Sequence, residues 1–452
     1  MNNVRRNQRG QSLIYVILVM IIMLASLSLV VDFGNAYLNK AEMQKAADAA
    51  SLAAVRELPY TNIAQSVSYN YASFNGFAHG IDSVSVYSYP HDINSNWYVV
   101  EIHKDVKHIL APIIGFDSLA ISVKSVSEFN AYIPINISGD GEYGANGTMT
   151  LSMFGPYGYY SYGDAFSPRW LNNGDKNPTY RADGYDFILD VPDNYYQING
   201  TNAVKLEIFD PDTWNNGGDN AYPGLRIDEI RYAPSYPHPQ PSNIRNTTEY
   251  TLFAPDSTPN DYSDDVQIAK AIYGPEVSWT DMKWVSPDGF EFSTSDFGTG
   301  KYRINIKATD GSSENGFNLR AGPPSGDFDP DNGTSVTALG ALPLNFNDDG
   351  MITVTLGNVP AEAAGKKMHI NKFDTDVGAK SIVYRCDTLP GDWAGLLSGD
   401  GTWKEDILTL PSDYSGGTWT ATYYAGLQDT SVWTMWFEGM VAGQPGFVRL
   451  VE

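Results

Sequence analysis

Two acidic loops contain the residues whose types and spacing best suit binding chemistry. Both place carboxylates close together among turn-forming residues: Asp210, Asp212 and Asp219 in FDPDTWNNGGDN, and Asp327, Asp329 and Asp331 in DFDPDNG. Calcium takes about six to eight oxygen ligands, and a turning loop can direct several such side chains at one point. The loops therefore predict candidate calcium sites. The alternative is an ordinary turn, in which Asp and Asn side chains hydrogen-bond to their own backbone.

The rest of the sequence favours a protein that is not an enzyme. It has no GxSxG, HExxH or P-loop motif, and its single cysteine, Cys386, excludes an intramolecular disulfide. Apart from calcium, no cofactor is expected. One alternative stays open, a membrane-anchored carbohydrate-binding protein or glycoside hydrolase. Aromatic segments at 157–162, 422–424 and 432–437 could stack on sugars, and two carboxylates of an acidic body could lie about 5–10 Å apart.

The charge of the chain argues against nucleic acid as a partner. Its 53 acidic and 29 basic residues give a formal net charge of −24, whereas phosphate binding needs basic patches. The 42 glycines, 26 prolines and 29 tyrosines are typical of many short strands joined by turns.

An apolar run at residues 13–31 is expected to determine on which side of a membrane the rest of the chain lies. It contains no charged residue, and as a helix it would cover about 28 Å, close to the thickness of a bilayer core. A basic head, residues 1–12, precedes it with Arg5, Arg6 and Arg9. This arrangement predicts a single-pass membrane protein with a cytoplasmic N-terminus and an extracytoplasmic body at the cell surface. A cleaved signal peptide is the alternative, but its apolar region usually has about 7–15 residues.

Residues 32–130 are expected to form a long helix and a small α/β module. Alanines over 32–58 supply helix propensity and a smooth face that another helix can approach. Helical spacing recurs over 61–74 and 104–114, and alternation predicts strands at 84–86, 97–102 and 119–129. A linker rich in Gly and Asn follows at 131–150.

Residues 151–452 alternate between short apolar runs and turns. This pattern predicts a mainly β body of two sandwich or jelly-roll modules, 151–324 and 325–452. The expected fold class is therefore a transmembrane helix with a long helical extension and a small α/β module, followed by mainly β structure.

Several features occur together near the N-terminus. An arginine-rich head, Gly10 and the apolar run are followed by VDFG at 31–34, Tyr37, and Gln44 ahead of AADAA at 46–50. Together with the expected elements up to residue 130, they resemble the TadE/TadG-like proteins of the tight-adherence (Tad or Flp) pilus system over about residues 5–130. The resemblance implies a pilin-like module, pilus or secretion-system components as partners, and assembly into a homo-oligomer or filament.

One position departs from this resemblance. Pilin-like members are processed after a glycine that is followed five residues later by Glu. Gly10 would be that glycine and Gln11 the new N-terminus, but Tyr15 stands where the Glu is expected. The departure favours a minor pilin or an accessory protein with a role in adhesion over a principal filament subunit.

Overall fold

The described chain forms two compact units. The first contains the residues up to 130 together with 447–451, and the second contains the described residues between 131 and 446. In the computed structural model, the described residues are 11–451 apart from 59, 93–96, 132–134, 137–148, 160–162, 214–227, 231–238, 256–261, 263, 276, 327, 329, 347–349, 376–377, 379, 427–428 and 438–445.

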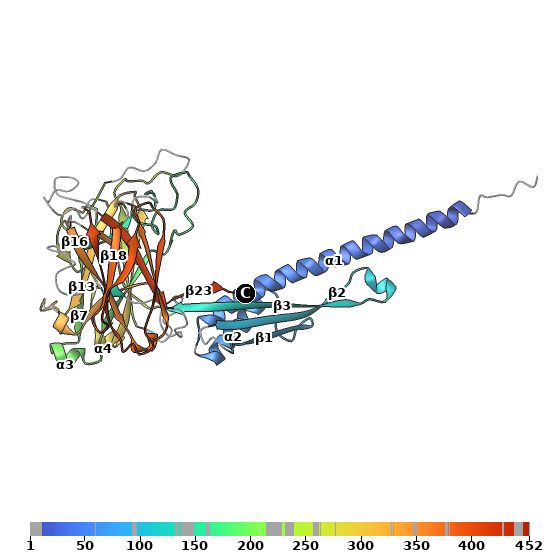
Figure 1. Ribbon diagram of the computed structural model, residues 1–452, viewed down its shortest axis with the longest axis horizontal. Coiled ribbons are helices and arrows are strands. Elements are labelled where there is room, and N and C mark those ends of the chain that lie inside the picture. The colour runs from blue at the N-terminus through green and yellow to red at the C-terminus, as the bar shows by residue number, and fades with distance from the viewer. Residues whose placement is uncertain are drawn as a thin grey trace, which may run out of the picture. The chain divides into compact units, whose positions relative to one another are not determined.

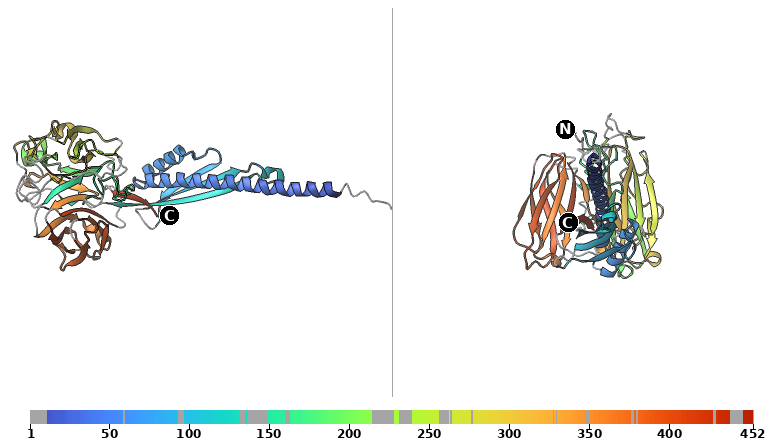
Figure 2. Two further views of the ribbon diagram at one scale, coloured as in Figure 1. Left: turned by 90° about the horizontal axis from the view of Figure 1, so that it is seen from above. Right: turned by 90° about the vertical axis from the view of Figure 1, so that its right-hand side faces the viewer.

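Two helices pack on the sheet of the first unit (Figures 1 and 2). α1 (Gln11–Val55) carries the apolar run into the alanine-rich stretch without a break, as the sequence predicted. α2 (Thr61–Phe74) has the bounds expected from its helical spacing. Small side chains allow elements to approach closely. The faces that the helices bury are rich in small residues: Ala46, Ala47, Ala50 and Ala54 beside Met43 and Val55 on α1, and Ala64, Ser68 and Ala72 on α2.

The sheet of the first unit is completed by the C-terminal end of the chain. Its order is β1 (Val84–Pro90), β2 (Trp97–Lys107), β3 (Ser118–Ala131) and β23 (Gly446–Leu450). The Val451 N–H donates to the Val126 carbonyl at 2.9 Å, and Arg449 Nε contacts Glu128 Oε2 at 2.6 Å. The second unit is therefore inserted, in sequence, between two neighbouring strands of the first.

The helix predicted over residues 104–114 is wrong. β2 continues to Lys107, which pairs with Ser118 of β3, and only Ala111–Ile114 form a helical turn, the 3₁₀-helix η2. Its last residue is followed by Gly115 at a φ of 89°, where a left-handed residue ends the turn. Pairing with the next strand, β3, therefore outweighed the local helical spacing.

The second unit contains three antiparallel sheets. The nine-stranded sheet has the order β10 (Trp284–Val285), β7 (Ala203–Phe209), β13 (Glu314–Gly322), β5 (Met149–Phe154), β15 (Leu342–Phe346), β22 (Asp429–Phe437), β17 (Lys367–Asp374) and β20 (Lys404–Thr409), with β11 (Glu291–Ser293) also on β7. The six-stranded sheet has the order β4 (Ile135–Asn136), β14 (Ser335–Leu339), β6 (Tyr185–Val191), β12 (Gly300–Asp310), β8 (Thr247–Phe253) and β9 (Gln267–Tyr273).

The four-stranded sheet has the order β16 (Gly350–Val359), β21 (Gly417–Ala425), β18 (Lys380–Cys386) and β19 (Trp393–Leu397). Four short helical segments lie between strands of the second unit: α3 (Tyr195–Asn199), α4 (Thr294–Phe297), η3 (Pro330–Asn332) and η4 (Ala361–Ala363). This mainly β architecture behind a long N-terminal helix confirms the expected fold class.

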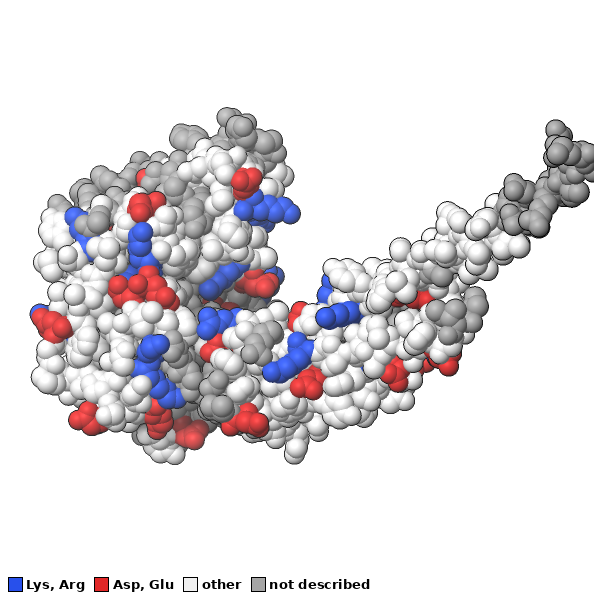
Figure 3. Space-filling view, turned by 45° about the vertical axis from the view of Figure 1, so that its right-hand side comes forward, with Lys and Arg blue, Asp and Glu red and all other residues white. Residues whose placement is uncertain are grey.

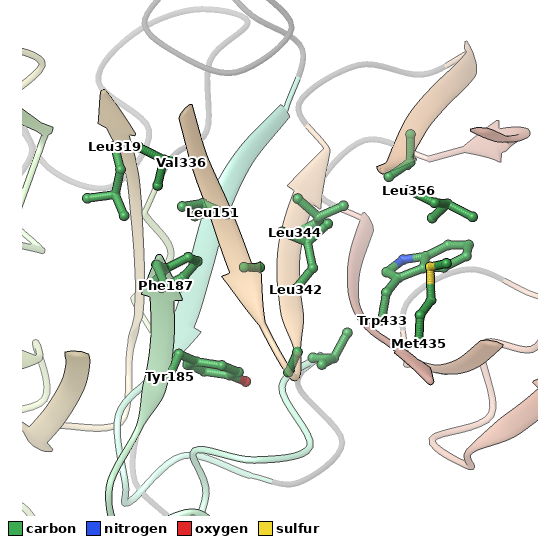
Figure 4. Packing of buried hydrophobic residues seen from close by; sticks show 14 of the residues in the cluster. Leu151, Tyr185, Phe187, Leu319, Val336, Leu342, Leu344, Leu356, Trp433 and Met435 are labelled. Carbon is green, nitrogen blue, oxygen red and sulfur yellow. The ribbon is translucent and has the colours of Figure 1, made fainter. Parts of the chain in front are cut away.

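The apolar core of the second unit lies between its sheets. Every second side chain of β6 is buried, which is the alternation expected of a strand with one face on a core. The rings of Phe187 and Phe317, with centroids 6.2 Å apart, join the six-stranded to the nine-stranded sheet. Tyr423 and Trp433, at 5.8 Å, join the four-stranded sheet to the same nine-stranded sheet. Figure 4 shows how the side chains of this core pack together.

The sheets do not divide between residues 324 and 325, where the sequence led us to expect a module boundary. β5 pairs with both β13 and β15, so strands from either side of this position belong to one sheet. β14 lies beyond it and pairs with β6. The two expected modules thus share strands, because a ladder of hydrogen bonds can join segments that are far apart in sequence.

Removing residues 446–452 should open the edge of β3. The β3 amides that face β23 should exchange roughly fivefold faster, because a backbone hydrogen bond contributes about 1 kcal/mol. Hydrogen exchange followed by mass spectrometry of the β3 peptides measures this. Arg449→Lys is the matched control: it keeps the strand and a cation beside the buried Glu128, and it should exchange like the wild type. Unchanged exchange in the truncated chain would show that β23 does not close the sheet.

Candidate functional sites: the anchor helix and a buried acidic centre

The first part of α1 has no cover within the described chain. Its described large apolar side chains from Leu13 to Val31 are all exposed. Among the described residues, α1 is the one helix long and apolar enough to cross a membrane. Figure 3 shows no charged side chain on the visible face of its first described turns. Such a surface is costly in water and is suited to lipid.

Asp32 is the first charged residue after the apolar run, and it is nearly completely buried. Its carboxylate accepts hydrogen bonds from the backbone N–H groups of Ile109 at 2.6 Å, Leu110 at 3.1 Å and Ala111 at 2.7 Å. These three groups belong to the turn between β2 and β3, so the turn is attached to α1 at the point where the apolar run ends. A carboxylate that accepts several N–H groups is held firmly in place.

Asp210 and Asp212 directly follow β7, and both are completely buried. Asp210 has a φ of 46°, which is uncommon for a residue other than glycine. Asp212 accepts hydrogen bonds from the Val277 N–H at 2.9 Å and from the Thr280 hydroxyl at 2.5 Å. Among the described residues, neither carboxylate oxygen of Asp210 has a hydrogen-bond partner. Because an isolated buried charge is very costly, Asp210 requires either a proton or a cation.

Two further acidic residues, which the sequence did not single out, lie near Asp210 and Asp212. We call Asp210, Asp212, Asp228 and Asp281 the acidic centre. Asp228 is 1% exposed; its Oδ1 accepts from the Gly316 N–H at 2.8 Å, and its Oδ2 has no partner among the described residues. Asp281 is also buried. They are brought near Asp210 by the fold and not by local spacing. Asp228 lies in LRIDEI, a segment in which apolar and polar residues alternate. A carboxylate in such a segment is the one sequence signal that could have singled it out.

The pKa values of Asp210 and Asp228 lie well above the usual range of a carboxyl group. Burial is the largest cause for both. The charges of Asp212 and Asp281 raise the pKa of Asp210 further. The Met282 N–H lies near the carboxyl group and lowers its pKa in part, but it does not form a hydrogen bond of normal geometry with either oxygen. The charge of Asp210 in turn raises the pKa of Asp228. In the absence of a cation, this centre therefore favours protonated carboxyl groups.

The structure describes only part of the two acidic loops. Asp331 is exposed in η3, whereas Asp219, Asp327 and Asp329 lie outside the described residues. No three described His, Cys, Asp or Glu side chains form a group that could hold a metal ion by themselves. The first loop gains Asp228 and Asp281 as neighbours. Calcium at either loop stays a prediction.

The residues named for processing and topology are mostly outside the described chain as well. Arg5, Arg6, Arg9 and Gly10 lie there, and Gln11 is the first residue of α1.

The aromatic segment at 432–437 belongs to the core. Trp433 is completely buried in β22, and Trp436 is 7% exposed and stacks on His369 with ring centroids 3.8 Å apart. In the segment at 422–424, Tyr423 is buried and Tyr424 is exposed. These two segments therefore present a single exposed ring, which is less than a flat sugar-stacking surface requires.

The N-terminal segment of the chain matches a known family. Residues 10–57 match the profile of the Tad family, described as Flp pilus-assembly TadE/G-like, which confirms the resemblance over that range. No curated protein matches the chain.

Structural comparison is less informative. The chain is similar to the N-terminal CBM22-1-CBM22-2 tandem domain of Xyn10C from Paenibacillus barcinonensis, with 11% identity, 80% of this chain and 92% of that chain covered, and a TM-score of 0.16. It is also similar to infectious bursal disease virus, Gx strain, with 9% identity, 72% and 75% covered, and a TM-score of 0.13. These TM-scores carry no argument about fold or function.

Asp210→Asn should stabilise the metal-free protein more at high pH than at low pH. With its raised pKa, folded Asp210 keeps a proton that the unfolded chain has lost. Its contribution to stability is therefore complete below about pH 4 and is lost as the pH rises towards the folded pKa. Between pH 5 and pH 8, the gain in Tm of the variant over the wild type should grow by about 2–4 °C, the shift that about 1 kcal/mol gives in a large domain.

Thermal unfolding in the presence of a chelator measures this difference. Asp296→Asn, at an exposed position of α4, is the matched control and should show no dependence of its Tm difference on pH. Equal differences for Asp210→Asn at pH 5 and pH 8 would contradict the prediction.

Proposed function

We propose that this protein is a single-pass, membrane-anchored component of a Tad-type pilus assembly system. The observation that carries this proposal is the match of residues 10–57 to the TadE/G-like family, over the same residues that build α1. The uncovered apolar surface of α1 supports it, because lipid is the solvent that such a surface favours. The role is structural, and no catalytic step is assigned to it.

The proposed orientation places the N-terminus in the cytoplasm and the β body outside, at the cell surface. Arg5, Arg6 and Arg9 precede the apolar run, and basic flanks of this kind are retained on the cytoplasmic side. The high negative charge of the chain is compatible with an exported, well-solvated surface.

Within such a system, we infer a minor pilin or an accessory protein that contributes to adhesion. Tyr15 cannot supply the carboxylate that a principal subunit would use to neutralise its neighbour's N-terminal amine. The small-residue faces of α1 and α2 show how helices of this kind pack closely. The second unit would supply the contact surface. The alternative of a carbohydrate-binding protein or hydrolase loses support, because the aromatic segments at 422–424 and 432–437 are mainly core. Residues 160–162 of the third segment lie outside the described residues.

Flotation with phosphatidylcholine vesicles tests the anchor, and protease shaving of intact cells tests the orientation. The full chain should float with the vesicles and lose its β body to external protease, whereas a chain lacking residues 11–31 should do neither. N-terminal sequencing of the mature protein then distinguishes the two roles. A start at Gln11 indicates processing and extraction into a filament, and an uncleaved start indicates a resident anchor. A wild-type chain that stays soluble would overturn the proposal.

We also propose that calcium is the cation that the acidic centre binds. The support is Asp210, completely buried with both oxygens unpartnered among the described residues, beside the further carboxylates of Asp212 and Asp228. Calcium also accepts carbonyl oxygens and water, so the side chains need not supply every ligand.

Calcium at about 100 times its Kd should raise the Tm of the wild type by roughly 5 °C, because binding then contributes about 2.7 kcal/mol. A chelator should reverse the shift, and Asp210→Asn should abolish it. Asp296→Asn, which keeps the centre intact, should respond like the wild type. A wild-type Tm that is indifferent to both calcium and chelator would mean that the carboxyl groups are neutralised by protons alone.

A further inference from the structure

Exposed apolar side chains gather in the first unit where the apolar run ends. Ile109 is 61% exposed and Phe116 is 65% exposed, both in the turn between β2 and β3. Phe33 and Tyr37, one helical turn apart on α1, are 60% and 74% exposed. We call these four residues the apolar tip. Large apolar side chains at such exposure cost free energy in water, so their concentration requires an explanation.

The tip is held at a fixed level along α1. Asp32 follows the apolar run directly, and its carboxylate accepts the backbone N–H groups of residues 109–111. One helical turn further on, the Asn35 side chain donates to the Lys107 carbonyl at 3.3 Å. The turn between β2 and β3 therefore lies beside the last residues that would be in the bilayer (Figure 1).

The composition of the tip suits the boundary between acyl chains and headgroups. Aromatic and aliphatic side chains are favoured at that boundary, where a helix or turn can bury an apolar face about 5–10 Å deep. Lys107 and Asp117 flank the turn and are exposed, so polar groups border the tip. Because the tip is continuous with the uncovered surface of α1, lipid is the occupant that its position favours over a protein partner.

We propose that the apolar tip is a second membrane contact, in which the turn between β2 and β3 dips into the bilayer interface beside the transmembrane part of α1. This inference rests on the proposed membrane anchor and adds a contact that residues 10–57 alone do not contain. Two contacts would fix the depth and the rotation of the first unit at the membrane, which a single helix leaves free.

Site-specific fluorescence in vesicles tests this contact. Phe116→Cys and Ile109→Cys in the full chain are each labelled with an environment-sensitive fluorophore and reconstituted in phosphatidylcholine vesicles. Tyr60→Cys is the matched control: Tyr60 is 63% exposed and follows the other end of α1, about 35 Å along the helix from Asp32. Cys386 is buried, and labelling of the wild type measures its background reaction.

We expect labels at 109 and 116 to be quenched by lipid carrying a nitroxide near the headgroup, and several-fold less by aqueous iodide than the label at 60. Iodide quenching as strong as at 60 would overturn the inference. Shielding from iodide without quenching by the lipid nitroxide would also overturn it, because a protein neighbour would then cover the tip. Flotation of the same samples separates the two proposals. Chains that do not float refute the membrane anchor itself, whereas floating chains with water-exposed labels refute only the second contact.

Discussion

The carboxylate of Asp32 is the interaction on which the first unit depends. It is the first charge after the nineteen-residue apolar run, and it is buried against three backbone N–H groups of a turn that lies more than seventy residues further along the chain. Without it, those N–H groups would lack their acceptor and α1 would lose its attachment to the sheet at this level. One side chain thus converts an apolar helix into an element with a folded module at a defined position.

Local signals predicted the parts of the fold that local forces decide. The alanine-rich continuation of α1 and the bounds of α2 follow from propensity and helical spacing, and both were confirmed. Lys104 to Lys107 show the limit, since their spacing suggested a helix and their pairing with β3 made them a strand. The pairing of β14 with β6, and of β23 with β3, could not be predicted either, because nothing in one sequence specifies which distant strands become neighbours.

The acidic centre also has one part that the local sequence indicates and one part that only the folded chain brings together. Asp210 and Asp212 could be singled out because they lie together in a turn-like stretch. Asp228 and Asp281 could not, since the contacts that make them relevant are formed only by the folded sheets. Their burial changes the interpretation of the loop. An exposed Asp-rich turn needs no ligand. Buried carboxyl groups that lie close together must be neutralised by protons or by a cation. Which of the two neutralises them depends on the pH and the cation concentration around the protein.

The position of β23 has a consequence for how this chain is made. β3 is synthesised early, and its partner strand follows more than three hundred residues later, or about 15–60 s at about 5–20 residues per second. Throughout that interval β3 presents an open edge, and open edges invite pairing with other chains. If the body is exported as it is made, the sheet of the first unit is closed only when β23 arrives. A chain that stops before β23 would therefore be left with an open edge on β3, which other chains or proteases can recognise.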